Sequence, residues 1–320
     1  MLIESKYSRK AITFGPGSAK ESLDVPSINH RLSFLSTARE TENGTVFSSR
    51  LVFKGAPMSI LVCHHITPRW IWGINSLTPG QLRNFLATAV EQGIHFVTLS
   101  QYIAKLDEPA QKRVALTFDD GYSDIETIAL SICREFGVVA TVFVLPLYAG
   151  KYNSWDVNWF GQKIRHLDWP QIGKLVDAGW EIGSHGLSHR DLSRLPETDC
   201  AEELRVSRQL IYERSGNWPA AIAYPFGNVS RKTVQLATDI GYRAGVVSSN
   251  KFDGFFSKMT LSRIGVYRFD TRRLFVQKCL GKNKQIVHYL QRGIDFCSNG
   301  TVVVKQLIPT QWDRIRASRE

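Results

Sequence analysis

The chain has 320 residues, of which 43% are hydrophobic and 22% charged, values typical of a globular protein with one large or two small domains. Its formal net charge of +11 favours contact with anions, such as an anionic membrane surface or an acidic glycan. Because no recognition helix and no long Lys/Arg block accompanies this charge, we expect no nucleic-acid partner.

The sequence gives no sign of export or of a membrane span. The first residues lack the apolar core of a signal peptide, and no window approaches the length of about 18 apolar residues that a spanning helix needs. The five cysteines form no closely spaced pair, which suits reduced thiols. We therefore expect a cytoplasmic protein, peripheral at the inner membrane if it is associated with it.

Residues 1–55 are polar and rich in Ser and Thr, and we expect an extension that forms a hairpin or is partly disordered. From residue 59 onward, strand and helix patterns alternate. Strands are predicted at 59–63, 95–99, 113–118, 138–145, 180–184, 220–224, 243–247 and 263–267. Helices are predicted at 79–93, 100–106, 124–136, 170–178, 197–214 and 231–240. Eight strands separated by helices indicate parallel pairing, and a barrel fits this number better than a large open sheet.

Four short clusters of residues with possible catalytic or metal-binding roles each follow one of the predicted strands. They are Cys63-His64-His65, Asp119-Asp120-Gly121, His185-Gly-Leu-Ser-His189 and Tyr224-Pro-Phe-Gly227. In a parallel barrel the carboxyl ends of the strands lie on one face, where such barrels build their catalytic sites. The pattern therefore predicts that carboxylates and imidazoles converge on that face as a metal-hydrolase centre.

The residue types in these clusters suit metal-assisted chemistry. Two adjacent carboxylates, Asp119 and Asp120, point in different directions, so one can bind a cation while the other accepts a proton. His185 and His189, four residues apart, can offer two ring nitrogens to the same ion. Two nitrogens and one oxygen leave open positions for water and substrate and favour zinc or a similar ion.

A long insertion, residues 147–168, follows the strand predicted at 138–145 and is rich in aromatic residues. Long loops at this face of a barrel are usually functional. Trp155 and Trp159 would suit stacking on sugar rings. The alternative is a loop that packs on itself and uses these aromatics for its own core.

The motifs resemble those of a known family. Thr117-Phe-Asp-Asp-Gly121, Ser184-His-Gly-Leu-Ser-His189 and Tyr224-Pro-Phe-Gly227 are similar to successive motifs of the polysaccharide deacetylases, the family 4 carbohydrate esterases with a NodB-homology domain. The resemblance implies a distorted (β/α)7 barrel that removes N-acetyl groups, or sometimes O-acetyl or formyl groups, from amino sugars. The implied domains are an extension at 1–55, a deacetylase-like catalytic domain at 56–285, and a basic C-terminal segment at 286–320 that packs on the barrel or is partly flexible.

The resemblance also implies residue roles. Asp119 corresponds to the general base, and Asp120, His185 and His189 correspond to the ligands of a divalent metal, most often Zn²⁺, with Co²⁺ or Ni²⁺ as alternatives. The backbone N–H of Phe226 corresponds to an oxyanion donor. We expect further substrate contacts from Tyr224, Trp155 and Trp159.

Two departures from the family pattern point to a variant of it. The third motif usually begins with an Arg that orients the catalytic Asp, and this position is Ala223. The late His that usually serves as general acid has no clear counterpart, since His288 lies beyond the last predicted strand. The segment Ile60-Leu-Val-Cys-His-His-Ile resembles the first strand of circularly permuted deacetylases, which implies that His64 is the acid. His65 could share or exchange this role.

The sequence therefore predicts a metal-dependent hydrolase that removes an N-acetyl group from an amino-sugar glycan or its precursor. One alternative is a deformylase or deacetylase of a lipid-linked sugar at the cytoplasmic membrane face. The other is a non-catalytic glycan-binding pseudoenzyme, suggested by the missing Arg at position 223.

Overall fold

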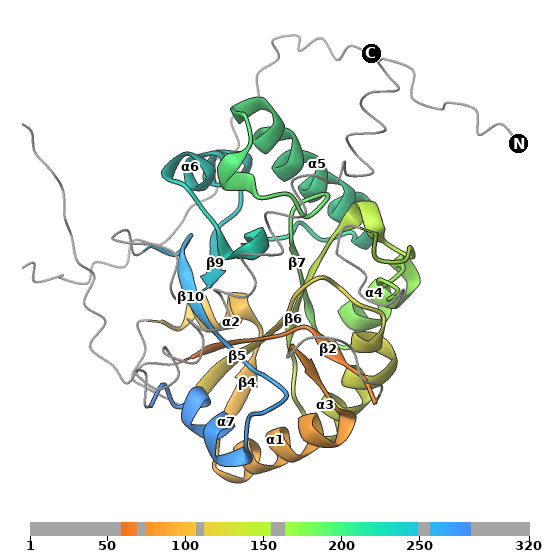
Figure 1. Ribbon diagram of the computed structural model, residues 1–320, viewed down its shortest axis with the longest axis vertical. Coiled ribbons are helices and arrows are strands. Elements are labelled where there is room, and N and C mark those ends of the chain that lie inside the picture. Colours follow the sequence, from red (N-terminus) through yellow and green to blue (C-terminus); the bar gives the residue numbers. More distant parts are fainter. Residues whose placement is uncertain (1–58, 69–74, 107–111, 155–163, 249–256, 283–320) are drawn as a thin grey trace, which may run out of the picture. The chain divides into compact units, whose positions relative to one another are not determined.

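A computed structural model describes residues 59–68, 75–106, 112–154, 164–248 and 257–282, and all structural statements below concern these residues. Its parallel strands are β1 (Ile60–Cys63), β4 (His95–Val97), β5 (Arg113–Phe118), β6 (Thr141–Val144), β7 (Glu181–Ser184), β8 (Ala221–Ala223), β9 (Ala244–Ser248) and β10 (Leu261–Gly265). Because β1 pairs with both β5 and β10, seven of them close into a ring, with β4 beside β5 outside it. The predicted (β/α)7 barrel is thus confirmed (Figure 1).

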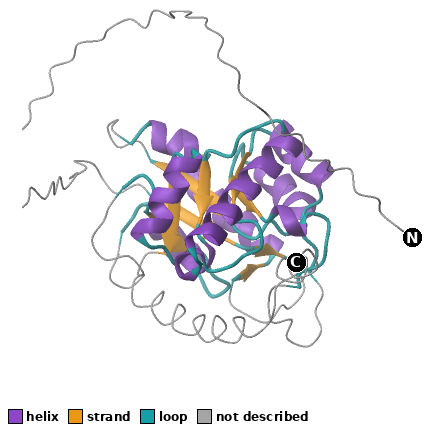
Figure 2. Cartoon of the chain, turned by 90° about the horizontal axis from the view of Figure 1, so that it is seen from above, coloured by secondary structure: helices purple, strands orange, loops and turns teal. Residues whose placement is uncertain are grey.

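Helices surround the strands, as Figure 2 shows from above. They are α1 (Pro79–Glu91), α2 (Leu99–Ala104), α3 (Leu130–Glu135), α4 (Trp169–Asp177), α5 (Glu197–Ser215), α6 (Arg231–Ile240) and α7 (Arg272–Cys279). Three of them begin with the same device, a capping box in which a Thr or Asp side chain and a Gln three residues later bond each other's backbone N–H. A short parallel pair, β2 (His65–Ile66) with β3 (Ser76–Leu77), lies beyond the end of β1.

Apolar side chains, four of them alanines, fill the interior of the barrel. Successive side chains of a strand point to opposite faces, so every second residue enters the interior. The interior cluster consists of Ile60, Ala115, Phe143, Ala221, Ala223, Ala244, Val246 and Leu261, with Leu99 and Tyr102 of α2. The backbone N–H of Leu99 donates to Thr141 Oγ1 at the first residue of β6, so α2 closes the amino end of the barrel. The opposite end carries the polar clusters.

The structure differs from the predicted elements at several places. The strand predicted at 138–145, for example, is the shorter β6, Thr141–Val144. The last strand, expected at 263–267, is β10 and begins two residues earlier, because Arg263 is an interior residue of the strand rather than its start. The helix expected at 124–136 begins as a π-helical turn, Ile125–Ala129, that leads into α3. Helix α7, which begins after the N-cap Thr271, was not among the predicted helices.

Two of the predicted segments, 1–55 and 286–320, lie outside the described residues. Within the described part of the chain, no helix has both the length and the apolar composition that crossing a membrane requires.

A buried ion pair fixes the chain after β10. Lys278 of α7 donates to the carbonyl oxygen of Gly265 at 2.7 Å and to Asp270 Oδ2 at 2.6 Å, and both charged side chains are buried. The same carboxylate oxygen accepts the backbone N–H of Tyr267. The pair therefore holds the end of β10, and with it the interior residues of that strand, against α7.

We expect Lys278→Met to lower the free energy of unfolding by about 3–5 kcal/mol, because it leaves the Asp270 carboxylate buried without its cation. The double variant Asp270→Asn/Lys278→Met should be clearly more stable than the single one, since the amide is neutral and can still accept the Tyr267 N–H. Urea unfolding followed by circular dichroism measures both. Equal stability of the single variant and the unchanged protein would contradict the assigned role of the pair.

Candidate metal and catalytic centre

The carboxyl ends of β5 and β7 carry the main polar residues of the site. Asp119 follows β5 in the alternation that sends Ala115 to the interior, so its side chain enters the mouth of the barrel. Asp120, His185 and His189 form a buried group whose ligand atoms all lie within 4.8 Å of one another. The structure therefore brings together these four residues, as the sequence predicted.

The geometry of this group fits a divalent metal ion. Asp120 Oδ1 lies 3.4 Å from His185 Nε2 and 3.5 Å from His189 Nε2. Zinc bonds of about 2.0–2.2 Å in tetrahedral geometry separate ligand atoms by about 3.3–3.6 Å, so the observed spacing suits such an ion. Asp120 Oδ1 is buried, and no hydrogen bond to it is found among the described residues. A buried carboxylate oxygen facing two imidazole nitrogens is the donor set of a first-row metal site.

Backbone carbonyls orient two of the groups involved. The Nδ1–H of His185 donates to the carbonyl oxygen of Ala223 at 2.7 Å. The other ring nitrogen, Nε2, is then unprotonated and directs its lone pair toward Asp120. The Nδ1–H of His166 donates to the carbonyl oxygen of Asp120 itself, also at 2.7 Å. The segment around His166 runs along the Asp119-Asp120-Gly121 turn, with the N–H of Leu167 donating to the Gly121 carbonyl. The turn is thus held from outside the barrel.

Backbone strain is concentrated at the same place. Among the described non-glycine residues, Asp120, His189 and Phe226 have positive φ angles, of 66°, 63° and 60°. This left-handed conformation costs about 1–3 kcal/mol for such residues and persists only where the surroundings fix it. All three come from the clusters predicted from sequence, so the strain coincides with the candidate site.

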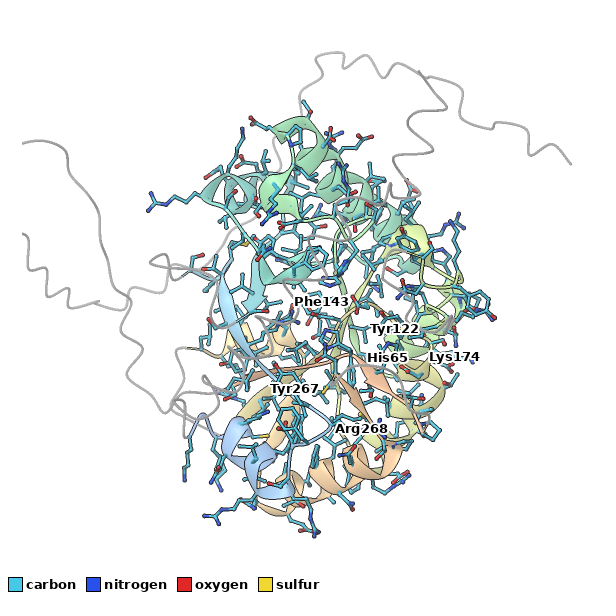
Figure 3. All side chains as sticks on the ribbon, viewed as in Figure 1. His65, Tyr122, Phe143, Lys174, Tyr267 and Arg268 are labelled. Carbon is cyan, nitrogen blue, oxygen red and sulfur yellow. The ribbon has the colours of Figure 1, made fainter. Side chains whose placement is uncertain are left out.

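Asp119 has a close cationic partner that the sequence analysis missed. Arg263 of β10 donates from Nη1 to Asp119 Oδ1 and from Nη2 to Oδ2, each at 2.6 Å, and from Nη1 to Thr117 Oγ1 at 3.2 Å. Its guanidinium also lies over the ring of Phe143, labelled in Figure 3. Burial raises the pKa of Asp119, but the Arg263 charge and hydrogen bonds, with His185, lower it more, so the net pKa is below its usual range. Asp119 is held ionised in a fixed orientation.

Arg263 makes a contact with Asp119 that an alanine at position 223 cannot make. Ala223 faces the barrel interior from β8, and Arg263 enters the same interior from β10, two strands along the ring. The sequence did contain a signal for this. Arg263 stands between Leu261 and Gly265 at alternate positions of an apolar strand, and a charged residue on a buried face needs a partner.

The structure separates the two histidines after β1. His64 continues the interior alternation of that strand and is half-buried, with Asp120 and Asp119 as its main attractive charges; burial lowers its pKa and these carboxylates partly offset that effect. His65 points the other way, where its Nδ1 bonds Asp124 Oδ2 at 3.0 Å and its ring stacks on Tyr122 at 3.6 Å (Figure 3). Of the pair, His64 is the one beside the carboxylates.

The third motif contributes contacts of two kinds. The Phe226 ring packs edge-on against His189, with centroids 4.6 Å apart. The Tyr224 side chain is 0% exposed and packs on the outer side of β8 with Leu204 and Ala237, so it does not face the mouth of the barrel. Its carbonyl accepts the N–H of Gly227, which closes the turn that carries Phe226. Trp155 and Trp159 lie outside the described residues.

Comparison with known proteins agrees with this picture. Residues 107–245 match the polysaccharide deacetylase family. The chain is 30% identical over 141 residues to the Bacillus subtilis (strain 168) protein YxkH, whose name places it among the polysaccharide deacetylases; the match covers 44% of this chain and 46% of YxkH. It is 27% identical over 132 residues to the peptidoglycan-N-acetylglucosamine deacetylase PgdA of Listeria monocytogenes, covering 41% of this chain and 24% of PgdA. The chain thus spans less than half the length of these relatives.

A solved structure shares the fold. The Streptococcus pyogenes deacetylase PplD, in complex with acetate, superposes with a TM-score of 0.60 at 22% identity, covering 69% of this chain and 97% of that one. In closed parallel barrels, carboxylates and histidines at the carboxyl ends of the strands occupy the face where catalytic sites are built. Through residues 107–245, the chain is thus similar to the polysaccharide deacetylase family.

We expect the purified, chelator-treated protein to bind one Zn²⁺ per chain, and His189→Gln to weaken this binding by at least tenfold, because it removes one of three ligands. Isothermal titration calorimetry measures the affinity. His95→Gln is the matched control, since His95 is an exposed residue of β4 at the other end of the barrel. Zinc binding unchanged in the His189 variant, or lost equally in the control, would contradict the assigned ligand set.

Proposed function

We propose that this protein is a metal-dependent carbohydrate deacetylase that removes an N-acetyl group from an amino sugar of a glycan or glycan precursor. The observation that carries the proposal is the buried Asp119–Arg263 ion pair beside the group formed by Asp120, His185 and His189. One carboxylate is fixed as a proton acceptor, while the neighbouring carboxylate faces two imidazole nitrogens. A proton acceptor next to a metal-binding carboxylate suits metal-assisted amide hydrolysis.

In the proposed reaction, Asp120, His185 and His189 hold the cation. A bound Zn²⁺, Co²⁺ or Ni²⁺ supplies a Lewis acid that lowers the pKa of water and polarises the acyl carbonyl. Asp119 accepts the proton of the attacking water, and Arg263 keeps this carboxylate ionised and correctly oriented. We assign the Phe226 backbone N–H to the developing oxyanion.

His64 is the proposed general acid. It lies beside both carboxylates and is half-buried, so it is placed to donate a proton to the leaving amine. His65 is engaged with Asp124 and Tyr122, which favours His64 over its neighbour for this role. This assignment keeps the proposed circularly permuted arrangement, in which the acid comes from the first strand of the barrel.

The names of relatives suggest the class of substrate. PgdA of Listeria monocytogenes is named for peptidoglycan N-acetylglucosamine, and a similar protein of Arthroderma benhamiae, 29% identical over 130 residues, is a chitin deacetylase. We therefore propose a β-linked N-acetylglucosamine glycan, or its precursor, as the substrate. Trp155 and Trp159 remain our proposed stacking residues for its sugar rings, and Tyr224 acts through its backbone turn.

The direct test is acetate release by the zinc-loaded protein from N-acetylchitooligosaccharides, peptidoglycan fragments and N-acylated lipid-linked sugars, with formate measured in parallel. Acetate release that a chelator abolishes supports the proposal. Formate release, or reaction with the lipid-linked sugars alone, would favour the membrane-associated alternative. Tight glycan binding with no release from any of these substrates would favour a pseudoenzyme.

We expect Asp119→Asn to lower kcat by about 10²- to 10⁴-fold, because it removes the proton acceptor. Its zinc affinity should stay close to that of the unchanged protein, since Asp120 and the two histidines remain. Acetate-release kinetics and zinc titration measure the two effects separately. If the variant kept most of its activity, Asp119 would not be the base.

Arg263→Gln should shift the acidic limb of the kcat/KM profile to higher pH. The cation lowers the pKa of Asp119 against the opposing effect of burial, so its removal raises that pKa and the base becomes protonated at a higher pH. Arg263→Lys retains a positive charge and should shift the limb less. Arg243→Gln, at an exposed arginine just before β9, is the control for lost surface charge. An unmoved limb in Arg263→Gln would show that the pair does not tune the base.

A further inference from the structure

A carboxylate from outside the barrel binds the loop that joins the two candidate histidine ligands. Glu203 lies on α5 and is only 1% exposed. Its Oε2 accepts the backbone N–H groups of Leu187 and Ser188, each at 3.0 Å, and its Oε1 accepts the Ser188 hydroxyl. Both residues lie between His185 and His189.

The next turn of α5 binds the same loop. The Ser207 hydroxyl donates to the carbonyl oxygen of Gly186 at 3.0 Å and contacts the Ser184 hydroxyl at 2.8 Å. Glu203 and Ser207 are four residues apart, so they occupy one face of the helix. That face therefore bonds both the N–H and the C=O groups of the loop.

The loop needs this support because its backbone is irregular. His185 and His189 have the spacing of neighbours on a helix, but the residues between them form no helix, and His189 has a φ of 63°. Two consecutive N–H groups instead converge on one carboxylate oxygen, as they do in a backbone anion site. The distance between the two imidazoles thus depends on where Glu203 holds Leu187 and Ser188.

We propose that Glu203 is a positioning residue that sets the metal affinity of the site by fixing the loop between His185 and His189. The inference rests on the proposed metal site. The hydrogen bonds of Glu203 go to Leu187 and Ser188 of the loop, so we expect its effect to reach the metal through the backbone of the loop. Groups that hold metal ligands in place in this way typically change affinity by about 10- to 100-fold when removed.

The test compares the zinc affinity of the unchanged protein with that of several variants. Glu203→Ala should bind Zn²⁺ about 10- to 100-fold more weakly, because the loop loses the acceptor of three hydrogen bonds. Glu203→Gln should come within about threefold of the unchanged protein, since its amide oxygen still accepts both backbone N–H groups. Glu202→Gln is the matched surface control, being the neighbouring carboxylate on the same helix.

Leu204→Ala distinguishes positioning from general destabilisation. Leu204 is buried next to Glu203 and packs in the core between α5 and the strands, so its truncation lowers the melting temperature without removing a bond to the loop. We expect its zinc affinity to be unchanged at temperatures where circular dichroism shows it folded. The visible absorption of bound Co²⁺ should shift in Glu203→Ala and not in Leu204→Ala, because only the first alters the ligand geometry.

The possible outcomes separate the two proposals. If the unchanged protein binds no Zn²⁺, the metal site itself is wrong. If it binds Zn²⁺ and Glu203→Ala binds equally well, or Leu204→Ala loses as much affinity, the positioning role is wrong. Should Glu203→Ala fail to fold, Glu203→Asp takes its place: it keeps the charge but is one methylene shorter, and zinc affinity unchanged in that variant would overturn the inference.

Discussion

The buried ion pair between Asp119 and Arg263 is the interaction on which the rest of the centre depends. Removing both charges from water carries a large penalty, which only close, two-point hydrogen bonding can offset. The pair meets this condition, with two contacts of 2.6 Å and a further bond from Arg263 to Thr117. It also joins β5 to β10 through the interior, so the position of the carboxylate depends on the closure of the whole ring.

Closure of the ring in turn depends on β1, which pairs with both β5 and β10. Strand β1, which leads to His64, therefore lies between the strand that leads to Asp119 and the strand that carries Arg263. The Lys278–Asp270 pair stabilises the same region from outside the ring, because it fixes the chain just after β10. The groups proposed to transfer protons, Asp119 and His64, thus directly follow strands that also close the barrel.

The candidate ligands are held differently, from the outer side of the barrel. Ala223 and His166 bond the His185 ring and the Asp120 carbonyl, while α5 bonds the loop between the histidines. These contacts maintain the positive φ angles of Asp120 and His189, which an unsupported loop would relax. Hydrogen bonds within the protein thus hold the candidate ligands in place, as electrostatic preorganisation requires.

Local sequence patterns were sufficient for most elements and for the ligand group. The strand Arg113–Phe118 and the helix Arg231–Ile240 have the predicted bounds, because alternation, caps and turn residues are local signals. The partner of Asp119 could not be found in this way. Arg263 lies 144 residues along the chain from Asp119, and only the pairing of β1 with β5 and β10 brings the two strands into one interior. The sequence showed that position 223 lacks an Arg, but it did not show that Arg263 contacts Asp119.

This relocation changes how the missing motif residue should be understood. A guanidinium acts on Asp119 through its position and charge, and neither property depends on the strand that supplies it. Small residues such as Ala115, Ala223 and Ala244 are part of the barrel interior, and the long side chain of Arg263 reaches the carboxylate there from β10. Loss of the motif arginine therefore argues for a pseudoenzyme only when no other interior cation replaces it. In this barrel Arg263 makes two hydrogen bonds to Asp119 from β10. We therefore interpret the departure at Ala223 as a change of the strand that supplies this interaction, and not as a reason to reject the proposed catalysis.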